Sequence, residues 1–188
     1  MTRTNRAAWA SHHRRGDVLR AVVDHADLHR DGLLPTHLPG VAETFHGEVD
    51  LVAALQLRWH TRLAGRVERA LMDEPTDLEA AVLSAWRATA DELTGVRMIL
   101  DRAAEAPATE ELATALRRAE AKEHTLLAVM AGQAAMSDAE APRVGRALEE
   151  KARAGFHPAP VTRSTAGSRR ADGSHRSLVG RLKAVLAA

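Results

Sequence analysis

The chain has 188 residues, a formal net charge of +1 at pH 7, and neither cysteine nor tyrosine. Without cysteine it can form no disulfide, no thiolate zinc site and no iron–sulfur cluster, and it has no cysteine nucleophile. Charged residues make up 27% and hydrophobic residues 45% of the chain, ordinary values for a globular domain that argue against wholesale disorder.

The remaining composition favours helices over strands. About a fifth of the residues are alanine, which has the best intrinsic helix propensity and lets helix backbones approach closely. β-branched residues nowhere alternate with polar residues over the length of a strand. We therefore expect an all-α bundle of about five helices over residues 9–155, preceded by a flexible basic segment over residues 1–8.

The first two predicted helices account for residues 9–72. The first runs from about Trp9 to Leu28 and ends at Arg30-Asp31-Gly32, which provides a stop signal. The second runs without proline from about Val41 to Met72, a length of about 45 Å at 1.5 Å per residue. It is apolar on more than one side, which predicts a central position in the bundle. Its main stripe contains Phe45, Val49, Val52, Trp59, Leu63 and Val67.

Two capping-box patterns mark the starts of later helices. In such a box, a hydroxyl residue and a carboxylate three residues later satisfy each other's free backbone amides. Thr76–Glu79 predicts the start of a third helix, with a break or kink at Gly95, and Ser137–Glu140 predicts the start of a fifth helix that ends at Gly155. Between them, periodic apolar residues predict a fourth helix over about Glu110–Ala135.

The amino-acid composition changes twice within the last 33 residues. Residues 156–175 are rich in proline, glycine, serine, threonine and arginine, which predicts a disordered basic linker. Residues 176–188 regain amphipathicity and predict a short terminal helix. This helix can fold back onto the bundle, dock on a protein partner or lie on a membrane surface. Its predicted partner-docking residues are Leu178, Val179, Leu182 and Val185.

Part of this segment resembles a known docking peptide. Residues 179–183, Val-Gly-Arg-Leu-Lys, follow Asp172-Gly173-Ser174 and look somewhat like the C-terminal cargo-loading peptides of bacterial encapsulin shells. The similar stretch is under a tenth of the chain. It departs from those peptides at Arg181, where a small residue is expected, and in Ala184–Ala188, so it assigns no family.

The near-neutral total charge conceals an uneven distribution. Residues 1–20 sum to +4 and residues 155–188 to +5, which leaves −8 for residues 21–154. The basic ends could contact nucleic-acid phosphates, or they could stay solvated or lie against the acidic body. The acidic body and the absence of a helix-turn-helix signature argue against nucleic-acid binding. The candidate residues for nucleic-acid binding are Arg14, Arg15, Arg169 and Arg170.

Histidines and carboxylates at helical spacing form a candidate metal site. Side chains three or four positions apart on a helix can meet one ion, and facing helices can complete its ligand shell. The pattern matches neither di-iron bundles nor hemerythrin-like bundles as a whole. The alternative interpretation is that these histidines bond to neighbouring carboxylates or water. The candidate ligands for a transition metal or haem are His25, His29, His46, Asp50, His60 and His124, with Glu43, Glu120 and Glu123 as further carboxylates.

Motifs of other enzyme classes are missing from the sequence. There is no G-x-S-x-G elbow, no Walker A loop and no G-x-G-x-x-G. No apolar run approaches the roughly 18 residues of a membrane span, and the first residues lack the hydrophobic stretch of a secretory signal, which predicts a cytoplasmic location.

These observations predict a non-catalytic helical-bundle interaction or scaffold protein, without a cofactor, that binds a protein partner or itself. The alternative is a metal- or haem-binding bundle, with an oxidoreductase as one form of it. Three tryptophans, Trp9, Trp59 and Trp86, are the predicted core anchors.

Overall fold

The structure, a computed structural model, describes residues 3–73 and 75–157, with side chains from His13 onward. Over these residues all regular structure is helical, so the predicted all-α class is confirmed, although the helices number seven rather than about five. They are α1 (Arg3–His29), α2 (Val41–Thr44), α3 (Glu48–Met72), α4 (Leu78–Glu92), α5 (Thr94–Glu105), α6 (Glu110–Met130) and α7 (Ala141–Ala154).

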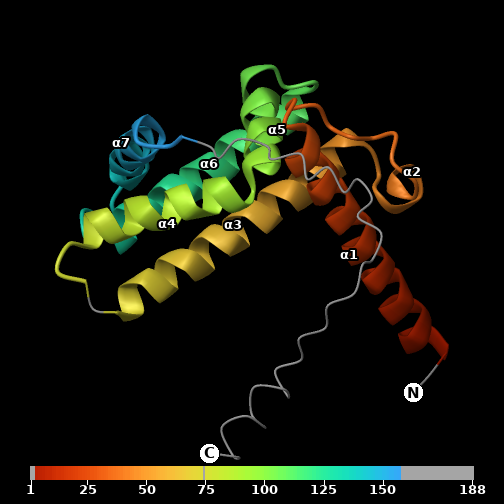
Figure 1. Cartoon of the computed structure of the whole chain (residues 1–188), viewed down its shortest axis with the longest axis horizontal. Coiled ribbons are helices and arrows are strands. Elements are labelled where there is room, and N and C mark those ends of the chain that lie inside the picture. Colours follow the sequence, from red (N-terminus) through yellow and green to blue (C-terminus); the bar gives the residue numbers. More distant parts are fainter. Residues whose placement is uncertain (1–2, 74, 158–188) are drawn as a thin grey trace, which may run out of the picture.

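The helices pack as a bundle from which one end of α1 extends (Figure 1). Helix α3 packs against α4, α5 and α6, and α6 forms its most extensive contact with α7. Helix α1 packs mainly on α5 through its C-terminal half, where Val22, Val23 and Ala26 are buried, while its N-terminal half leaves the body. Helix α3 is therefore central, as its apolar sides predicted.

Aromatic side chains join the central helices. Trp59 on α3 and Trp86 on α4 are fully buried and meet edge to face, with ring centroids 5.8 Å apart. Phe156 adds a second edge-to-face contact on Trp86, at 6.0 Å. The predicted core positions of Trp59 and Trp86 are confirmed, whereas the side chain of Trp9 lies outside the described ones. Because Phe156 packs on the core, the body continues into the first residues of the predicted linker.

The predicted continuous helix over Val41–Met72 is wrong, because the chain leaves the helix between α2 and α3. Phe45 has extended backbone, with φ −114° and ψ 136°, and its side chain is buried. Gly47 has φ 97° and ψ −171°, a conformation open essentially to glycine alone. The turn that buries Phe45 thus requires glycine at position 47. The spacing of apolar residues in the sequence does not change at this break, so it gives no sign of it.

The break within the predicted third helix occurs at Leu93, between α4 and α5, rather than at Gly95. Gly95 lies in the first turn of α5, where its missing side chain lets α1 approach. A Cβ there would stand 2.1 Å from the carbonyl oxygen of Ala26. The Gly95 N–H donates to Oδ1 of Asp27 at 2.7 Å. The glycine is thus required for a helix crossing and not for the break itself.

Neither capping box forms. Helix α4 is capped by Asp77, whose Oδ1 accepts from the Ala80 N–H at 2.9 Å, so the cap is one residue later than Thr76. Before α7, Oδ1 of Asp138 accepts from the N–H of Glu140 in a turn, and the helix begins at Ala141. In both cases an aspartate, whose short carboxylate reaches nearby amides readily, replaces the hydroxyl residue.

Other helix ends shift by a few residues. Helix α1 begins at Arg3 instead of Trp9, so the predicted flexible segment is mostly helical in the structure. It ends at the predicted signal, where Arg30 has φ 50° and Gly32 has φ 69°. Helix α6 ends at Met130, five residues before the predicted end, because Gly132 turns the chain with φ 70°. None of the helices in the described part of the chain is long and apolar enough to cross a membrane.

Candidate functional site

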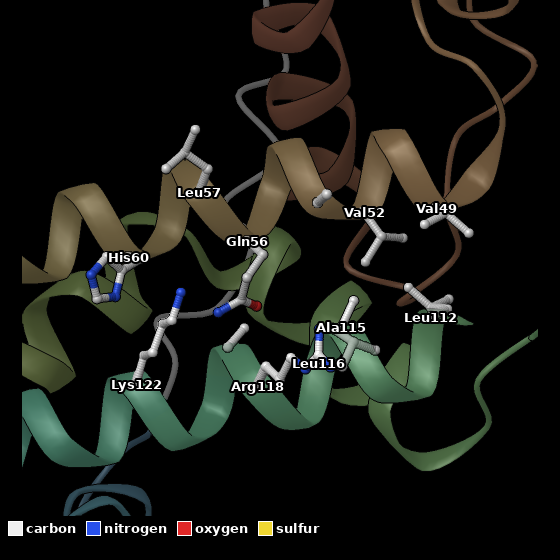
Figure 2. A pocket seen from close by; sticks show the side chains of 12 residues that line it. Val49, Val52, Gln56, Leu57, His60, Leu112, Ala115, Leu116, Arg118 and Lys122 are labelled. Carbon is white, nitrogen blue, oxygen red and sulfur yellow. The ribbon is translucent and has the colours of Figure 1, made fainter. Parts of the chain in front are cut away.

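An apolar groove of about 340 Å³ lies between α3 and α6 (Figure 2). Its floor contains the buried side chains of Val52, Leu112 and Leu116. Above this floor the facing positions of α6, Ala115 and Ala119, carry only methyl groups. These side chains are too short to cover the core beneath them, so the helix pair leaves part of its apolar surface open to solvent.

The polar groups of the groove are all amides or bases. Gln56 and His60 extend from α3 toward α6, and Lys122 extends from α6 toward α3, while Arg118 lies farther along α6 (Figure 2). No carboxylate is among the twelve lining residues. Within the described residues, neither Arg118 nor Lys122 forms an ion pair, and the Gln56 amide has no hydrogen-bond partner. The groove therefore offers an apolar floor with a cationic edge.

A second hollow of about 390 Å³ continues the groove along α6. It shares His60 and Lys122 with the first and ends at Leu126 and Met136. The distance along α6 from Leu112 to Leu126 is about 21 Å at 1.5 Å per residue. The two hollows together match the length of about four helical turns.

The predicted metal ligands near the end of α1 lie together. The rings of His25 and His29 stack with centroids 3.9 Å apart, and His37 approaches His25 edge-on at 5.2 Å. Nδ1 of His29 bonds to the carbonyl oxygen of His25 at 2.9 Å. Partial burial and the neighbouring His29 and His37 lower the pKa of His25.

Asp50 and His46 also lie together, but Asp50 is engaged by Arg15. The guanidinium of Arg15 donates two hydrogen bonds to the Asp50 carboxylate, at 2.7 and 3.2 Å. The backbone N–H of His46 donates to the same carboxylate at 3.0 Å, and its Nδ1 lies 3.5 Å away. The bonds from Arg15 and His46 hold the pKa of Asp50 well below its ordinary value of 3.8. Arg15, a candidate for phosphate contact, thus joins α1 to α3 in the structure, and its contact with nucleic acid stays a prediction.

His60 and His124 lie on different sides of the bundle. His60 lines the groove, whereas His124 is buried and its Nε2 lies 2.6 Å from Oε2 of Glu149 on α7. No group of three or more histidines, aspartates or glutamates suited to a metal ion occurs among residues 3–73 and 75–157. The metal or haem site remains a prediction. Among the described residues, Glu43 and Glu120 form no bond to the other candidate ligands; Glu43 is exposed and Glu120 is half-buried.

His124 belongs to a partly buried network of charged side chains that sequence reasoning missed; His124 itself is buried, whereas Arg153 is exposed. Arg153 on α7 bonds to Glu149 and, with two hydrogen bonds of 2.8 and 3.0 Å, to Asp101 on α5. Asp101 accepts in turn from Nε of Arg97 at 2.9 Å. Arg97 lies over the ring of Trp59 and 3.9 Å from Oε1 of Glu123, so the network ties α3, α5, α6 and α7 together.

The acids of this network have opposite pKa shifts. Burial raises the pKa of Glu123 above its ordinary value of 4.5, although nearby Arg97 opposes the change. Burial also opposes ionisation of Glu149, but the bond to His124 and the charges of Arg153 and Arg97 outweigh it and lower its pKa to about 2. The pKa of Asp101 is likewise lowered, because the two arginines outweigh its burial. Each charged group thus has a partner of opposite sign.

The other predicted contact residues lie outside the described part of the chain. They are the nucleic-acid candidates Arg169 and Arg170 and the partner-docking residues Leu178, Val179, Leu182 and Val185. Arg14 is described and is exposed on α1.

Sequence reasoning did not identify the α3–α6 groove either. The only available signal was the pair of alanines at positions 115 and 119 beside two leucines on one helix face. Comparison with protein-family models, curated proteins and solved structures gave no match.

Proposed function

We propose that this chain is a non-catalytic cytoplasmic interaction protein whose helical body presents the α3–α6 groove to a protein partner. The groove carries this proposal because open apolar surface in a folded domain commonly marks a contact site. Met136 at its far end is 71% exposed, and Leu57, whose side chain points away from α6 and also lines a hollow beside α1, is 66% exposed (Figure 2). A partner that covers these side chains would remove the unfavourable free energy of exposing their apolar surface to water.

The distribution of charged groups supports a binding role rather than a catalytic one. His124, Glu149, Arg153 and Asp101 satisfy one another in the network and are not left free to act on a substrate. The groove contains His60, but none of its lining residues is a carboxylate that could orient the ring or a nucleophile that the ring could activate.

The terminal segment over residues 176–188 is proposed as a second, tethered contact. Its apolar residues Leu178, Val179, Leu182 and Val185 follow a stretch rich in glycine, serine and proline, a composition that lets a peptide reach a partner independently of the body. This contact is independent of the groove, so each can be removed without the other.

Photo-crosslinking tests the groove as a docking site. We would replace Gln56, whose side chain extends toward α6 in the groove (Figure 2), with p-benzoylphenylalanine, and separately Leu28, which is 60% exposed on α1 and is not a lining residue of the groove. After irradiation in the producing cell, the proposal predicts one covalent partner from position 56 only, identified by mass spectrometry. The crosslinked adduct should disappear when Ala115→Trp fills the groove. It should persist in the control variant Ala147→Trp, which changes an exposed position of α7. Equal adducts from both positions, or none, would overturn the proposal.

A further inference from the structure

We propose that the occupant of the groove is an acidic amphipathic helix of a partner protein, an inference that rests on the proposed function above. The charge of the groove edge carries this choice. Arg118, Lys122 and His60 line it, and no carboxylate does. An apolar face flanked by Asp or Glu would cover the floor and place negative charge against these bases.

Some arginines of the body have an ion-pair partner, whereas others, such as Arg58 and Arg146, have none among the described residues. Arg15 is paired with Asp50, and Arg62 and Arg66 share Glu92. Arg118 and Lys122, in contrast, form no ion pair with any residue that the structure describes. Exposed pairs contribute little affinity on their own, but unpaired charges at a rim set the orientation of a partner and its rate of association.

The shape of the groove favours a helix over an extended peptide. Its two hollows run about 21 Å along α6, the length of about fourteen helical residues. The floor is apolar at Leu112 and Leu116 and again at Leu126, with His60 and Lys122 between them, which suits a helix that presents residues i, i+4, i+7 and i+11 on one face with polar groups beside it. A strand would need a free sheet edge, and the described residues form none.

The same charge argument disfavours the chain's own terminal segment as the occupant. Residues 176–188 carry Arg176, Arg181 and Lys183 and no acidic side chain. Placed in the groove, these bases would face Arg118 and Lys122 with like charge. The segment therefore stays available for its own contact.

Selection from a displayed library tests the inference without a known partner. The library would present 18-residue helices with leucine at the four anchor positions and all flanking positions randomised, against the full-length chain. We expect the selected peptides to be enriched in Asp and Glu at the flanks. Their affinity should fall at least about tenfold for Ala115→Trp and stay within about twofold for Ala147→Trp. Gln56→Glu, which places a carboxylate inside the groove, serves as a second groove variant should the tryptophan variant fail to fold.

A charge reversal separates the partner's chemistry from the docking site itself. For a selected acidic peptide, Lys122→Glu should weaken binding roughly tenfold at low salt and much less at high salt, whereas Arg14→Glu should leave it nearly unchanged. If the selected peptides bind in the groove but are basic or neutral, the proposal of an acidic partner is wrong, while the proposal that the groove is a docking site is retained. If no selected peptide depends on the groove, both proposals fail. Tight, groove-dependent binding of a synthetic peptide of residues 176–188 would replace the partner with the chain's own segment.

Discussion

The indole Nε1 of Trp59 on α3 donates a 2.9 Å hydrogen bond to Oε2 of Glu123 on α6, and both side chains are almost fully buried. This bond joins the two helices that form the groove, within the core beneath it. Arg97 lies over the other part of the same indole, 4.9 Å from its centroid. Together these contacts fix how far apart α3 and α6 stand, and therefore the width of the groove.

Trp59→Phe should destabilise the fold more than Trp86→Phe does. The first change leaves the buried Glu123 carboxyl without its donor, a loss of about 1–3 kcal/mol beyond that of the smaller ring. Nε1 of Trp86, in contrast, is buried and has no hydrogen-bond partner, so Trp86→Phe changes only the size of the ring. Urea denaturation of both variants measures the difference. Equal losses would mean that the bond to Glu123 contributes nothing.

The opposite pKa shifts of Glu149 and Glu123 make the combined contribution of these two residues to stability largest near pH 4.5. Glu149 has its pKa lowered to about 2, so below pH 4.5 the unfolded chain binds more protons and the free energy of unfolding rises with pH. Glu123 has a raised pKa, so above pH 4.5 the folded chain binds more protons and the free energy falls as pH rises. Denaturation at a series of pH values measures both slopes.

Glu123→Gln isolates the descending part of that profile. The amide oxygen of glutamine can still accept from Trp59 but cannot ionise. The variant should lose the part of the decrease above pH 4.5 that Glu123 contributes and keep the increase below it, whatever its overall loss of stability. Glu149→Gln should do the reverse and make the increase below pH 4.5 smaller, while Asp50 and Asp101, whose pKa values are also lowered, maintain the rest of it. Parallel curves for Glu123→Gln and the parent chain above pH 4.5 would contradict the raised pKa.

Local sequence signals predicted much of this fold. The apolar spacing of α3 correctly placed Val52, Trp59, Leu63 and Val67 in the core. The break before α3 was missed because Phe45 keeps the helical spacing although its backbone is extended. Spacing reports which side chains are apolar, and it does not report the φ of Gly47.

Gly145→Ala should prevent the close crossing of α6 and α7. A Cβ at this position would stand 1.8 Å from the backbone carbonyl oxygen of His124, so the helices must separate. We expect a loss of at least about 3 kcal/mol, together with loss of the His124–Glu149 bond. The matched control is Gly16→Ala, where a Cβ meets nothing within 4 Å, and it should stabilise α1 by about 1 kcal/mol. A mild effect at Gly145 would contradict the close crossing.

Removal of residues 158–188 should leave the melting temperature of the body nearly unchanged. The described residues already bury both core tryptophans, and Phe156 closes the contact on Trp86. Calorimetry of a chain that ends at His157 measures this. A decrease of more than about 5 °C would mean that the terminal segment packs on the body as a further helix.

The candidate site was less predictable than the fold, because it depends on contacts between distant helices. Glu123 and His124 were identifiable as titratable residues on one helix. Their partners, Trp59 and Glu149, are 64 and 25 residues away. No spacing within one helix encodes such pairs. The groove likewise exists only where the alanines of α6 happen to face α3.

Hydrogen exchange of the full-length chain, with and without a bound acidic helix from the selection, tests the docking groove most directly. The proposal predicts added protection of backbone amides over residues 49–60 of α3 and 112–126 of α6. Protection should be unchanged over α7, which lies outside the groove lining. Added protection on α7 or along α1, with none on α3 and α6, would contradict the proposal.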